Sequence, residues 1–432
     1  MFKEELFMTD SATFNVGDKQ VELPYVAATQ GNNGHDITKL LAQTGDTTYD
    51  QGFSSTAACK SEITFIDGDA GVLQYRGYPI EQLAEHSSFL ECAYLVIYGE
   101  LPTADELKTF ESKINRSSMV DERMRDLLRC FPRNSHPMPV LSSAIMALST
   151  RESTGLDAES VEDATISLLA KVPTLAAYGY KTSLGDPMLY PDNSLSYVQN
   201  FERLSFGYPT ESYQFNDAIT KALEALLILH VDHEQNCSTS TVRLIGSSQA
   251  NIFASVAGGV NALSGPLHGG ANQSVLEMLQ QIKDSGMSVQ EFVTKVKNKE
   301  SGIKLMGFGH RIYKNYDPRA AIIKKHADEV LKLKEGRRDL LDIAQELEQA
   351  ALNDDYFQAR KLYPNVDFYS GLIYEAMGFP VNMFTVLFAI GRLPGWIAQW
   401  REQNEDKSTK IGRPRQIYVG ETKRDYVPMG NR

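Results

Sequence analysis

Cysteine is scarce in this sequence: four occur among 432 residues, and no CxxC pair is present. Small scaffolds that depend on disulfides are far richer in cysteine, so we expect free thiols and a cytoplasmic location. The opening segment, MFKEELFMTD, carries two glutamates and no long apolar stretch, unlike a secretory or transit segment. No run approaches the roughly 18 apolar residues that a membrane span requires, so we expect no membrane partner.

Positive charge is also in short supply. The chain holds 43 Lys and Arg against 55 Asp and Glu, a net charge of −12. This balance argues against nucleic acid or an anionic membrane as a partner. An anionic ligand would have to find basic groups locally. Residues 401–432 are the one clearly basic region, with eight Lys/Arg against five Asp/Glu.

Two nucleotide-binding signatures are missing. No Gly-Lys dipeptide occurs, which excludes a Walker A loop. Gly307-Phe308-Gly309 is only the front of a dinucleotide fingerprint, without its third glycine or a surrounding strand–helix unit. The sequence therefore does not predict a Rossmann domain.

The composition and the hydrophobic pattern of the chain predict a folded, mainly α protein. Hydrophobic residues make up 42 % of it and charged residues 23 %, which is close to the globular norm. Alternating polar and apolar residues predict two hairpins, at Thr13–Leu23 and Ile63–Arg76, and the stretch between Gly31 and Ser55 is typical of loop. From about Ile80 the periodicity is helical.

Start and stop signals place particular helices. Apolar spacing predicts a helix over Asp217–Gln235. Asp317 followed by proline predicts a helix start, and Asn365–Met377 predicts another helix with Asp367 near its beginning. Gly391 and Pro394 interrupt an apolar pattern, which predicts a helix, a break and a second helix.

His230, His233 and Glu234 form a first candidate site. Two imidazoles at i, i+3 beside a carboxylate could hold a metal, and this hypothesis would make the protein a metallohydrolase. The spacing is neither HExxH nor HxxEH, and a packed helix end with hydrogen-bonded histidines explains it better.

A second set of residues has the chemistry of proton transfer and carboxylate binding. His268 and His310 each lie in a glycine-rich turn, and Asp367 lies at a helix start. Arginine forks suit a di- or tricarboxylate better than lysine does; the candidates are Arg319, Arg392 and Arg413. Taken singly, Asp367 could be a helix cap, and Arg392 and Arg413 could be surface charges. Spacing alone does not show that the set converges.

At these residues the sequence resembles citrate synthase, in its longer bacterial (type II) form with an N-terminal β-rich extension. The resemblance covers nearly the whole chain. It implies a mainly α fold, with a large helical domain, a smaller helical domain closing over the cleft, and a short N-terminal β-rich region. The implied ranges are 1–78 for the β-rich region, 79–270 and 375–432 for the large domain, and 271–374 for the small domain. The motifs that carry it are, in order, LHVDHEQNCSTSTVR, SGPLHGGANQ, MGFGHRIYKNYDPRA, KLYPNVDFYSGLIY, FAIGRLPGWIAQW and GRPRQIY.

The resemblance implies a role for each catalytic candidate. Asp367 would take a methyl proton from acetyl-CoA. His268 would donate a hydrogen bond to the thioester oxygen, and His310 would polarise the ketone of oxaloacetate. The oxaloacetate or citrate carboxylates would be held by four residues, of which the last would reach a neighbouring subunit: His233, Arg319, Arg392 and Arg413. Arg415, two residues later, stays open as an alternative to Arg413.

It also implies partners. The CoA moiety would bind a turn and a nearby lysine, comprising Leu305, Met306, Gly307, Phe308, Gly309 and Lys314. No metal or prosthetic group would be needed, since acetyl-CoA enters as a substrate. The chain would form a homodimer or hexamer. Some bacterial members are inhibited by NADH through a site that includes a cysteine, and Thr210 stands at the matching position here, which weakens the expectation of an allosteric enzyme.

Two further alternatives stay open. A 2-methylcitrate synthase, using propionyl-CoA, would share the same chemistry, because one methylene in the acyl pocket is worth only about 1–3 kcal/mol. A non-catalytic helical assembly protein would also fit an acidic, helix-rich chain.

Overall fold

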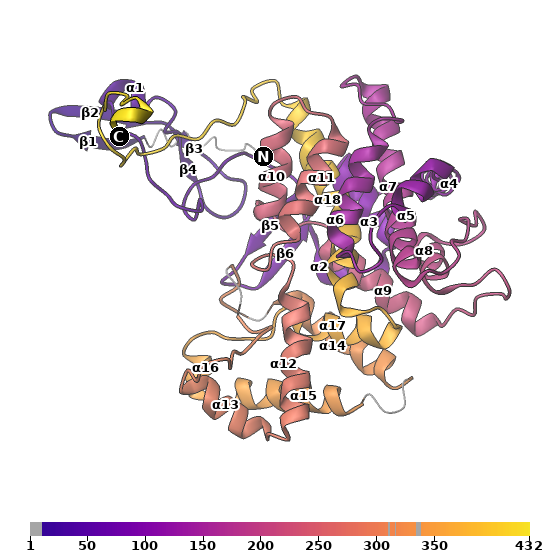
Figure 1. Ribbon diagram of the computed structural model, residues 1–432. Coiled ribbons are helices and arrows are strands. Elements are labelled where there is room, and N and C mark those ends of the chain that lie inside the picture. Colours follow the sequence, from indigo (N-terminus) through magenta and orange to yellow (C-terminus); the bar gives the residue numbers. More distant parts are fainter. Residues whose placement is uncertain (1–10, 310–311, 316, 334–337) are drawn as a thin grey trace, which may run out of the picture. The chain divides into compact units, whose positions relative to one another are not determined.

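The computed structural model describes residues 11–309, 312–315, 317–333 and 338–432 (Figure 1). It forms two compact units. The terminal unit comprises the residues up to Ala58 together with Lys410–Arg432, and the central unit comprises Cys59–Thr409. The sequence-based boundaries of the large and small helical domains are not tested by this division and stay predictions.

The terminal unit is built on short strands. β1 (Ala12–Val16) pairs antiparallel with β2 (Lys19–Leu23) as predicted, and Gly17, at a φ of 56°, makes the turn between them. β3 (Tyr25–Val26) pairs with β4 (Gly34–His35). The stretch expected to be mostly loop also contains a short helix, α1 (Leu40–Thr44), ended by Gly45 in the left-handed region. The remaining element of this unit is η2 (Met429–Asn431).

The second predicted hairpin opens the central unit. β5 (Thr64–Asp67) pairs antiparallel with β6 (Val72–Tyr75), and β7 (Tyr78–Pro79) adds a third strand. At the tip of the hairpin, one carboxylate oxygen of Asp67 accepts hydrogen bonds from the backbone N–H groups of Asp69 and Ala70.

Helices make up most of the central unit. Those that precede residue 265 are α2 (Ile80–His86), α3 (Phe89–Tyr98), α4 (Ala104–Ser117), α5 (Glu122–Arg129), α6 (Pro137–Leu148), α7 (Ala158–Leu184), α8 (Tyr197–Phe206), α9 (Asp217–His230), α10 (Cys237–Gly246) and α11 (Ile252–Leu263). Those that follow are α12 (Ala271–Ser285), α13 (Val289–Lys297), α14 (Pro318–Leu331), α15 (Arg338–Leu352), α16 (Asp355–Gln358), α17 (Asp367–Met377), η1 (Val381–Met383) and α18 (Phe384–Glu405). The mainly α fold class is confirmed.

Three predicted helices form with the expected signals. α9 begins after Asn216, whose side chain accepts hydrogen bonds from two backbone N–H groups, and it ends at His230, five residues earlier than predicted. Asp317 caps α14, with proline as its first helical residue. α17 ends at Gly378 in the left-handed region.

The predicted break at Gly391 and Pro394 is wrong. α18 continues through both residues and is buried along most of its length. A Cβ at Gly391 would lie 2.9 Å from Cβ of His230, and one at Gly395 would lie 2.0 Å from the carbonyl oxygen of Val231. These glycines therefore serve close packing against the end of α9, and packing on all sides holds the helix together despite the proline.

α18 is also the central helix of the core. It packs on α3, α9, α10 and α11 (Figure 1). Its Trp396 and Trp400 are among the largest fully buried side chains. Among the described residues, Val381–Glu405 is the one stretch that passes a length and hydropathy test for a membrane span. In this protein 89 % of that apolar window is buried inside the fold. A core helix of a globular protein passes the same test.

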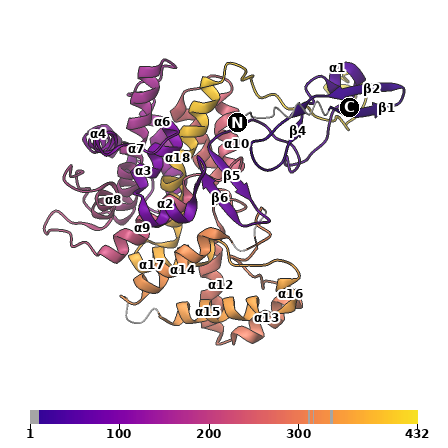
Figure 2. The same cartoon turned by 180° about the vertical axis from the view of Figure 1, so that it is seen from behind.

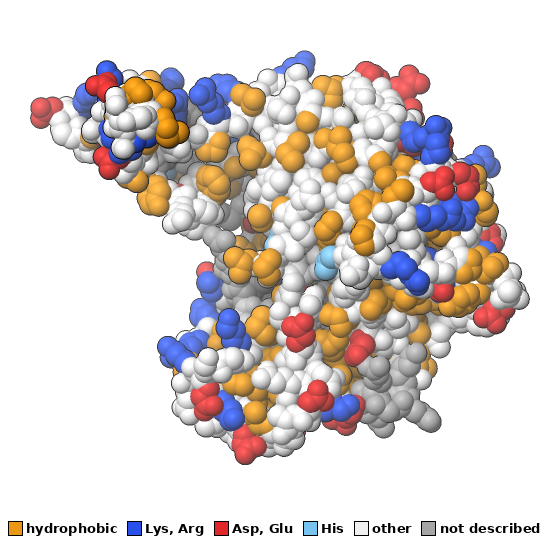
Figure 3. All heavy atoms as spheres, viewed as in Figure 1, with side chains coloured by type: hydrophobic (Ala, Val, Ile, Leu, Met, Phe, Trp, Pro, Cys, Tyr) orange, Lys and Arg blue, Asp and Glu red, His pale blue; other side chains and the backbone are white. Residues whose placement is uncertain are grey.

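A second group of helices packs together after residue 270. α12 lies against α15 and α17, α13 lies against α15, and α14 lies against α17 and α9, as both ribbon views show (Figure 2). Acidic and basic side chains are interspersed over the outer face of α12, α13 and α15 (Figure 3). This face has no single sign of charge, so it is an ordinary solvated surface.

Candidate active site

The turn after α9 carries two of the candidate histidines. His230 is buried at the end of the helix, and its Nδ1 lies 2.6 Å from the carbonyl oxygen of Leu226. Burial lowers the pKa of His230 to about 3, so the ring is neutral. His233 is also buried, and its Nε2 lies 3.3 Å from the hydroxyl of Tyr313.

The metal hypothesis finds no support in this turn. A carboxylate oxygen of Glu234 accepts a hydrogen bond from the backbone N–H of Ile66 at 3.1 Å. Within the described ranges of the chain, no three His, Cys, Asp or Glu side chains are grouped so as to hold a metal ion. His230 and His233 instead have the hydrogen-bonded, packed environment of the alternative interpretation.

His268 lies in the loop between α11 and α12. Its Nε2 lies 3.3 Å from the backbone nitrogen of Ser238 and 2.9 Å from the hydroxyl of the same residue. A Cβ at Gly269 would lie 2.4 Å from the carbonyl oxygen of Leu263, so glycine permits the tight turn here. Burial first, and then the charge of Arg392, lowers the pKa of His268 to about 4.

Arg319 lies in the first turn of α14. The carboxylate of Asp317 accepts from its Nε at 3.0 Å and from its Nη2 at 2.9 Å, and both side chains are almost fully buried. Burial lowers the pKa of the Arg319 guanidinium, but the negative charge of Asp317 raises it by more, so the pKa is raised overall. The bidentate pair fixes the direction of the fork.

Arg392 projects from the middle of α18. Its Nε donates to the carbonyl oxygen of His230 at 2.6 Å, and its guanidinium carbon lies 5.0 Å from the ring centroid of Phe388. Burial lowers its pKa to about 10, against the opposing effect of Asp232, so it stays charged at neutral pH. Its buried Nη1 has no hydrogen-bond acceptor among the described residues. That leaves one donor available to a bound anion.

Asp367 is the first residue of α17. Its backbone N–H donates to the side-chain oxygen of Asn365 at 3.0 Å, and the preceding Val366 N–H donates to Asp317 at 3.2 Å. Asp317 therefore links the start of α17 to Arg319. Burial raises the pKa of Asp367 to about 6, although the charges of Arg319 and Arg392 pull it down.

These side chains converge, which the sequence did not reveal. The charge of Arg392 acts on both His268 and Asp367, and the charge of Arg319 acts on Asp367 as well. Tyr313 connects the remaining member, because it touches His233 and lies with its ring centroid 5.8 Å from the guanidinium carbon of Arg319. One region thus holds a half-buried carboxylate, two buried arginines and two histidines.

The turn proposed for CoA lies against the segment that leads into α17. Gly307 and Gly309 have φ values of 77° and 76°, which favour glycine. Phe308 forms an antiparallel bridge with Pro364, and the N–H of Gly309 donates to the carbonyl oxygen of Tyr363 at 2.8 Å. Leu305 and Met306 pack partly buried against the core, and Lys314 is exposed nearby in sequence.

Two predicted residues are not placed at this site. His310 lies outside the described residues. Arg413 belongs to the terminal unit, so the central unit by itself does not contain it.

Sequence reasoning missed two residues that shape the site. Ser238 lies within the motif that also carries His233, and Tyr313 lies three residues after His310. Neither is unusual in type or spacing. Only the fold shows that each touches a candidate histidine.

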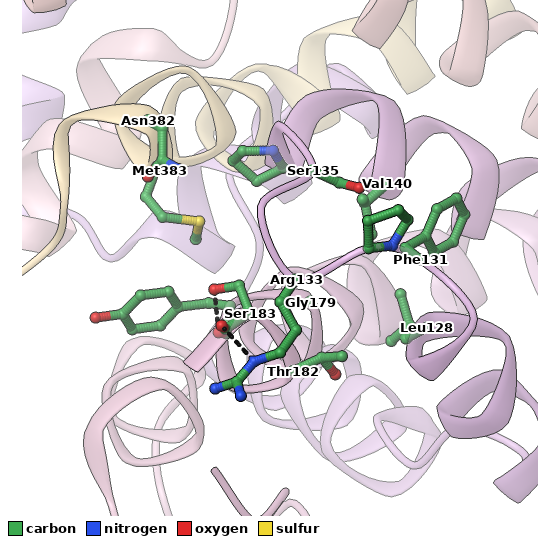
Figure 4. A pocket seen from close by; sticks show the side chains of 13 residues that line it. Leu128, Phe131, Arg133, Ser135, Val140, Gly179, Thr182, Ser183, Asn382 and Met383 are labelled. Carbon is green, nitrogen blue, oxygen red and sulfur yellow. Dashed lines mark hydrogen bonds between the residues drawn. The ribbon is translucent and has the colours of Figure 1, made fainter. Parts of the chain in front are cut away.

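A separate hollow lies between α5, α7 and η1 and contains about 390 Å³ of open space (Figure 4). Arg133 is the one charged side chain in its lining, and it donates to the backbone carbonyls of Ser183 and Leu184. None of the candidate catalytic side chains lines this hollow. It lacks the acid and base that the convergent site has.

Comparison with known proteins places the chain among a single group of enzymes. A family model described as "Citrate synthase, C-terminal domain" matches residues 52–415. "Citrate synthase 1" of Mycobacterium tuberculosis is 61 % identical over 426 residues, covering 98 % of this chain and 99 % of the relative. "Citrate synthase" of Corynebacterium glutamicum is 55 % identical over 438 residues, covering 100 % of both chains. The solved ternary complex of the Thermoplasma acidophilum citrate synthase with carboxymethyl coenzyme A and oxaloacetate is 30 % identical, with a TM-score of 0.82, and the match covers 89 % of this chain and 100 % of that one.

Proposed function

Because the chain belongs to the citrate synthase family, we propose that it condenses acetyl-CoA with oxaloacetate and hydrolyses the resulting citryl-CoA to citrate and CoA. The observation that supports this proposal is that Asp317 joins Arg319 to the start of α17, where Asp367 lies, while Arg392 contacts the end of α9. The charge of Arg392 also acts on both His268 and Asp367. The related complex with carboxymethyl coenzyme A and oxaloacetate supports the same pair of substrates.

The first step is removal of a methyl proton from acetyl-CoA. Asp367 is the base, and a pKa of about 6 keeps it ionised at neutral pH yet basic enough to accept a proton. Negative charge then develops on the thioester oxygen. His268, held neutral by its low pKa, donates a hydrogen bond to that oxygen and stabilises the enolate or enol.

The second step is attack of the enol carbon on the ketone of oxaloacetate. Arg392, Arg319 and His233 hold the carboxylates, and the free Nη1 of Arg392 supports this assignment. His310 polarises the ketone oxygen and protonates the alkoxide that forms; this role rests on the resemblance. Water then cleaves the thioester, which releases CoA and citrate.

CoA binding and assembly complete the proposal. The turn from Leu305 to Gly309 takes the adenine through its backbone, and Lys314 meets a phosphate. Arg413, in the terminal unit, reaches the site of a neighbouring subunit, so the active form is a homodimer or hexamer. The enzyme acts in the cytoplasm and needs no metal or prosthetic group. The family relatives give no support to the propionyl-CoA alternative.

A thiol-release assay with acetyl-CoA and oxaloacetate tests the function. We expect CoA release that depends on both substrates and is faster with acetyl-CoA than with propionyl-CoA. Asp367→Asn should lower kcat by about 10² to 10⁴-fold. Asp355→Asn, which also removes a carboxylate from the first turn of a helix, is the matched control and should have no effect. Absence of CoA release at saturating substrates would refute the proposal.

A further inference from the structure

Tyr313 occupies the space between two of the proposed oxaloacetate ligands. Its side chain is buried, with 2 % of its surface exposed. The hydroxyl lies 3.3 Å from Nε2 of His233, the two ring centroids are 5.6 Å apart, and the guanidinium carbon of Arg319 lies 5.8 Å from the tyrosine ring centroid. Moving Tyr313 would therefore disturb both ligands.

The tip of the β5–β6 hairpin holds the residues on either side of Tyr313. The backbone N–H of Lys314 donates to the carbonyl oxygen of Gly68 at 2.7 Å. A Cβ at Gly68 would lie 2.2 Å from the carbonyl oxygen of Ile312 and 2.8 Å from its carbonyl carbon. The obstacle is backbone, which cannot rotate away as a side chain can. Only glycine lets the two segments approach this closely.

The same hairpin is also tied to the turn that carries His233. The hydroxyl of Thr64 donates to the carboxylate of Asp232 at 2.6 Å, and the backbone N–H of Ile66 donates to Glu234 at 3.1 Å. Asp232 and Glu234 flank His233 in sequence. The same hairpin thus hydrogen-bonds to the neighbours of His233 through Thr64 and Ile66, and its tip at Gly68 contacts the neighbours of Tyr313.

We propose that Tyr313 is a positioning residue of the oxaloacetate site, set against His233 and Arg319 by the Gly68 tip of the β5–β6 hairpin. This inference rests on the proposed function. Tyr313 acts by fixing the His233 imidazole, so its contribution falls on oxaloacetate binding and leaves acetyl-CoA binding alone.

Two variants test the proposal from opposite sides. Tyr313→Phe removes the hydroxyl and keeps the hairpin, and Gly68→Ala forces the tip away and keeps the tyrosine. Oxaloacetate binding to each full-length protein is measured by calorimetry without acyl-CoA, followed by KM for both substrates and kcat. We expect Tyr313→Phe to weaken oxaloacetate binding about five- to tenfold, the usual effect of one lost hydrogen bond. Gly68→Ala should weaken it at least as much.

Controls separate positioning from general damage. Tyr94→Phe removes a hydroxyl from a ring that packs on Tyr98 and Phe110, and Asp69→Ala changes the exposed residue next to Gly68. Both should bind oxaloacetate as the parent does. The KM for acetyl-CoA should stay within twofold of the parent value in Tyr313→Phe and in both controls, because a merely destabilised fold would raise both KM values together. Gly68→Ala is judged on oxaloacetate binding alone, since the same tip also holds the backbone of Lys314.

The failure of this inference is distinct from the failure of the proposed function. If the parent protein binds no oxaloacetate and releases no CoA, the proposed function is refuted. If the parent binds oxaloacetate and Tyr313→Phe binds it equally well or more tightly, Tyr313 does not position the site. If Gly68→Ala does not unfold, by circular dichroism, and yet binds normally, the hairpin has no part in it.

Discussion

The backbone N–H of Ser238 points at Nε2 of His268 from 3.3 Å. The hydroxyl of the same serine lies 2.9 Å from this nitrogen, so Ser238 holds the imidazole through Nε2 with both its backbone and its side chain. The hydroxyl of Ser238 donates in turn to Asn236 at 2.7 Å and accepts from the indole N–H of Trp396 at 3.2 Å. Ser238 therefore holds the neutral His268 ring in one orientation.

His268→Gln tests this donor role. Glutamine can still donate, but Ser238 no longer fixes its direction, so the hydrogen bond to the developing oxyanion is lost or misaligned. We expect kcat to fall by about 10² to 10³-fold with a small change in the KM for oxaloacetate. Steady-state thiol release at saturating acetyl-CoA measures this. A variant with nearly parental kcat would show that His268 is not the donor.

The pH dependence of activity should report Asp367. Burial raises the pKa of Asp367 to about 6, and a carboxylate acts as a base only when it is ionised. Below pH 6, kcat/KM for acetyl-CoA should therefore fall about tenfold for each pH unit. His268 has a pKa of about 4 and stays neutral across this range. The acid limb should vanish in Asp367→Asn, whose residual rate should be flat between pH 5 and pH 7. An acid limb that persists in the variant would assign the titration to another group.

Asp367→Asn should also change stability in a pH-dependent way. Because the folded pKa is raised from its ordinary value of 3.8 to about 6, the folded chain binds more protons than the unfolded chain between these values. Stability of the parent therefore falls as the pH rises through this window and stays lower above it. The variant lacks this loss, so at pH 8 it should be more stable than the parent by on the order of 3 kcal/mol, and at pH 4 by much less. Urea unfolding at the two pH values measures the difference; an equal gain at both would contradict it.

Mixed subunits test the role of Arg413. Neither Asp367→Asn chains nor Arg413→Gln chains should be active alone. In a heterodimer where Arg413 crosses to the partner's site, the site containing the intact Asp367 also receives an intact arginine. Refolding an equimolar mixture should then restore about a quarter of parental activity, because half of the dimers are mixed and each has one complete site. If Arg413 completes the site of its own chain, mixing restores nothing.

Close packing at Gly395 should be sensitive to a single methyl group. A Cβ at this position would lie 2.0 Å from the carbonyl oxygen of Val231 and 2.8 Å from the carboxylate of Asp232. We expect Gly395→Ala to destabilise the fold by about 1–3 kcal/mol. It should also raise the KM for oxaloacetate, because the displaced backbone leads directly to His233. Gly430→Ala has nothing within 4 Å of the new Cβ and is the control for thermal unfolding.

Local signals decided much of the fold. Asp317 before proline starts α14, Gly378 ends α17, and alternation around Gly68 makes the β5–β6 hairpin. Each of these depends on a few neighbouring residues and on their backbone preferences, so a single sequence is enough to find them. The prediction of a break at Gly391 and Pro394 failed because contacts distant in sequence decide the structure there. There the local preference for a break is overridden by packing against α9, which lies more than 150 positions earlier in the chain.

The candidate site, like the fold, was partly predictable from the sequence and partly decided by the tertiary structure. Residue types and the ordered motifs were sufficient to select Asp367, His268, Arg319 and Arg392 and to indicate the family. Whether they meet was decided by the tertiary structure, since contacts between α9, α14, α17 and α18 join residues far apart in sequence. The same contacts set their charge states. Burial raises the pKa of Asp367 against the pull of the two arginines, and burial together with the charge of Arg392 lowers the pKa of His268. Burial and distance are properties of the packed chain, and no local pattern encodes them.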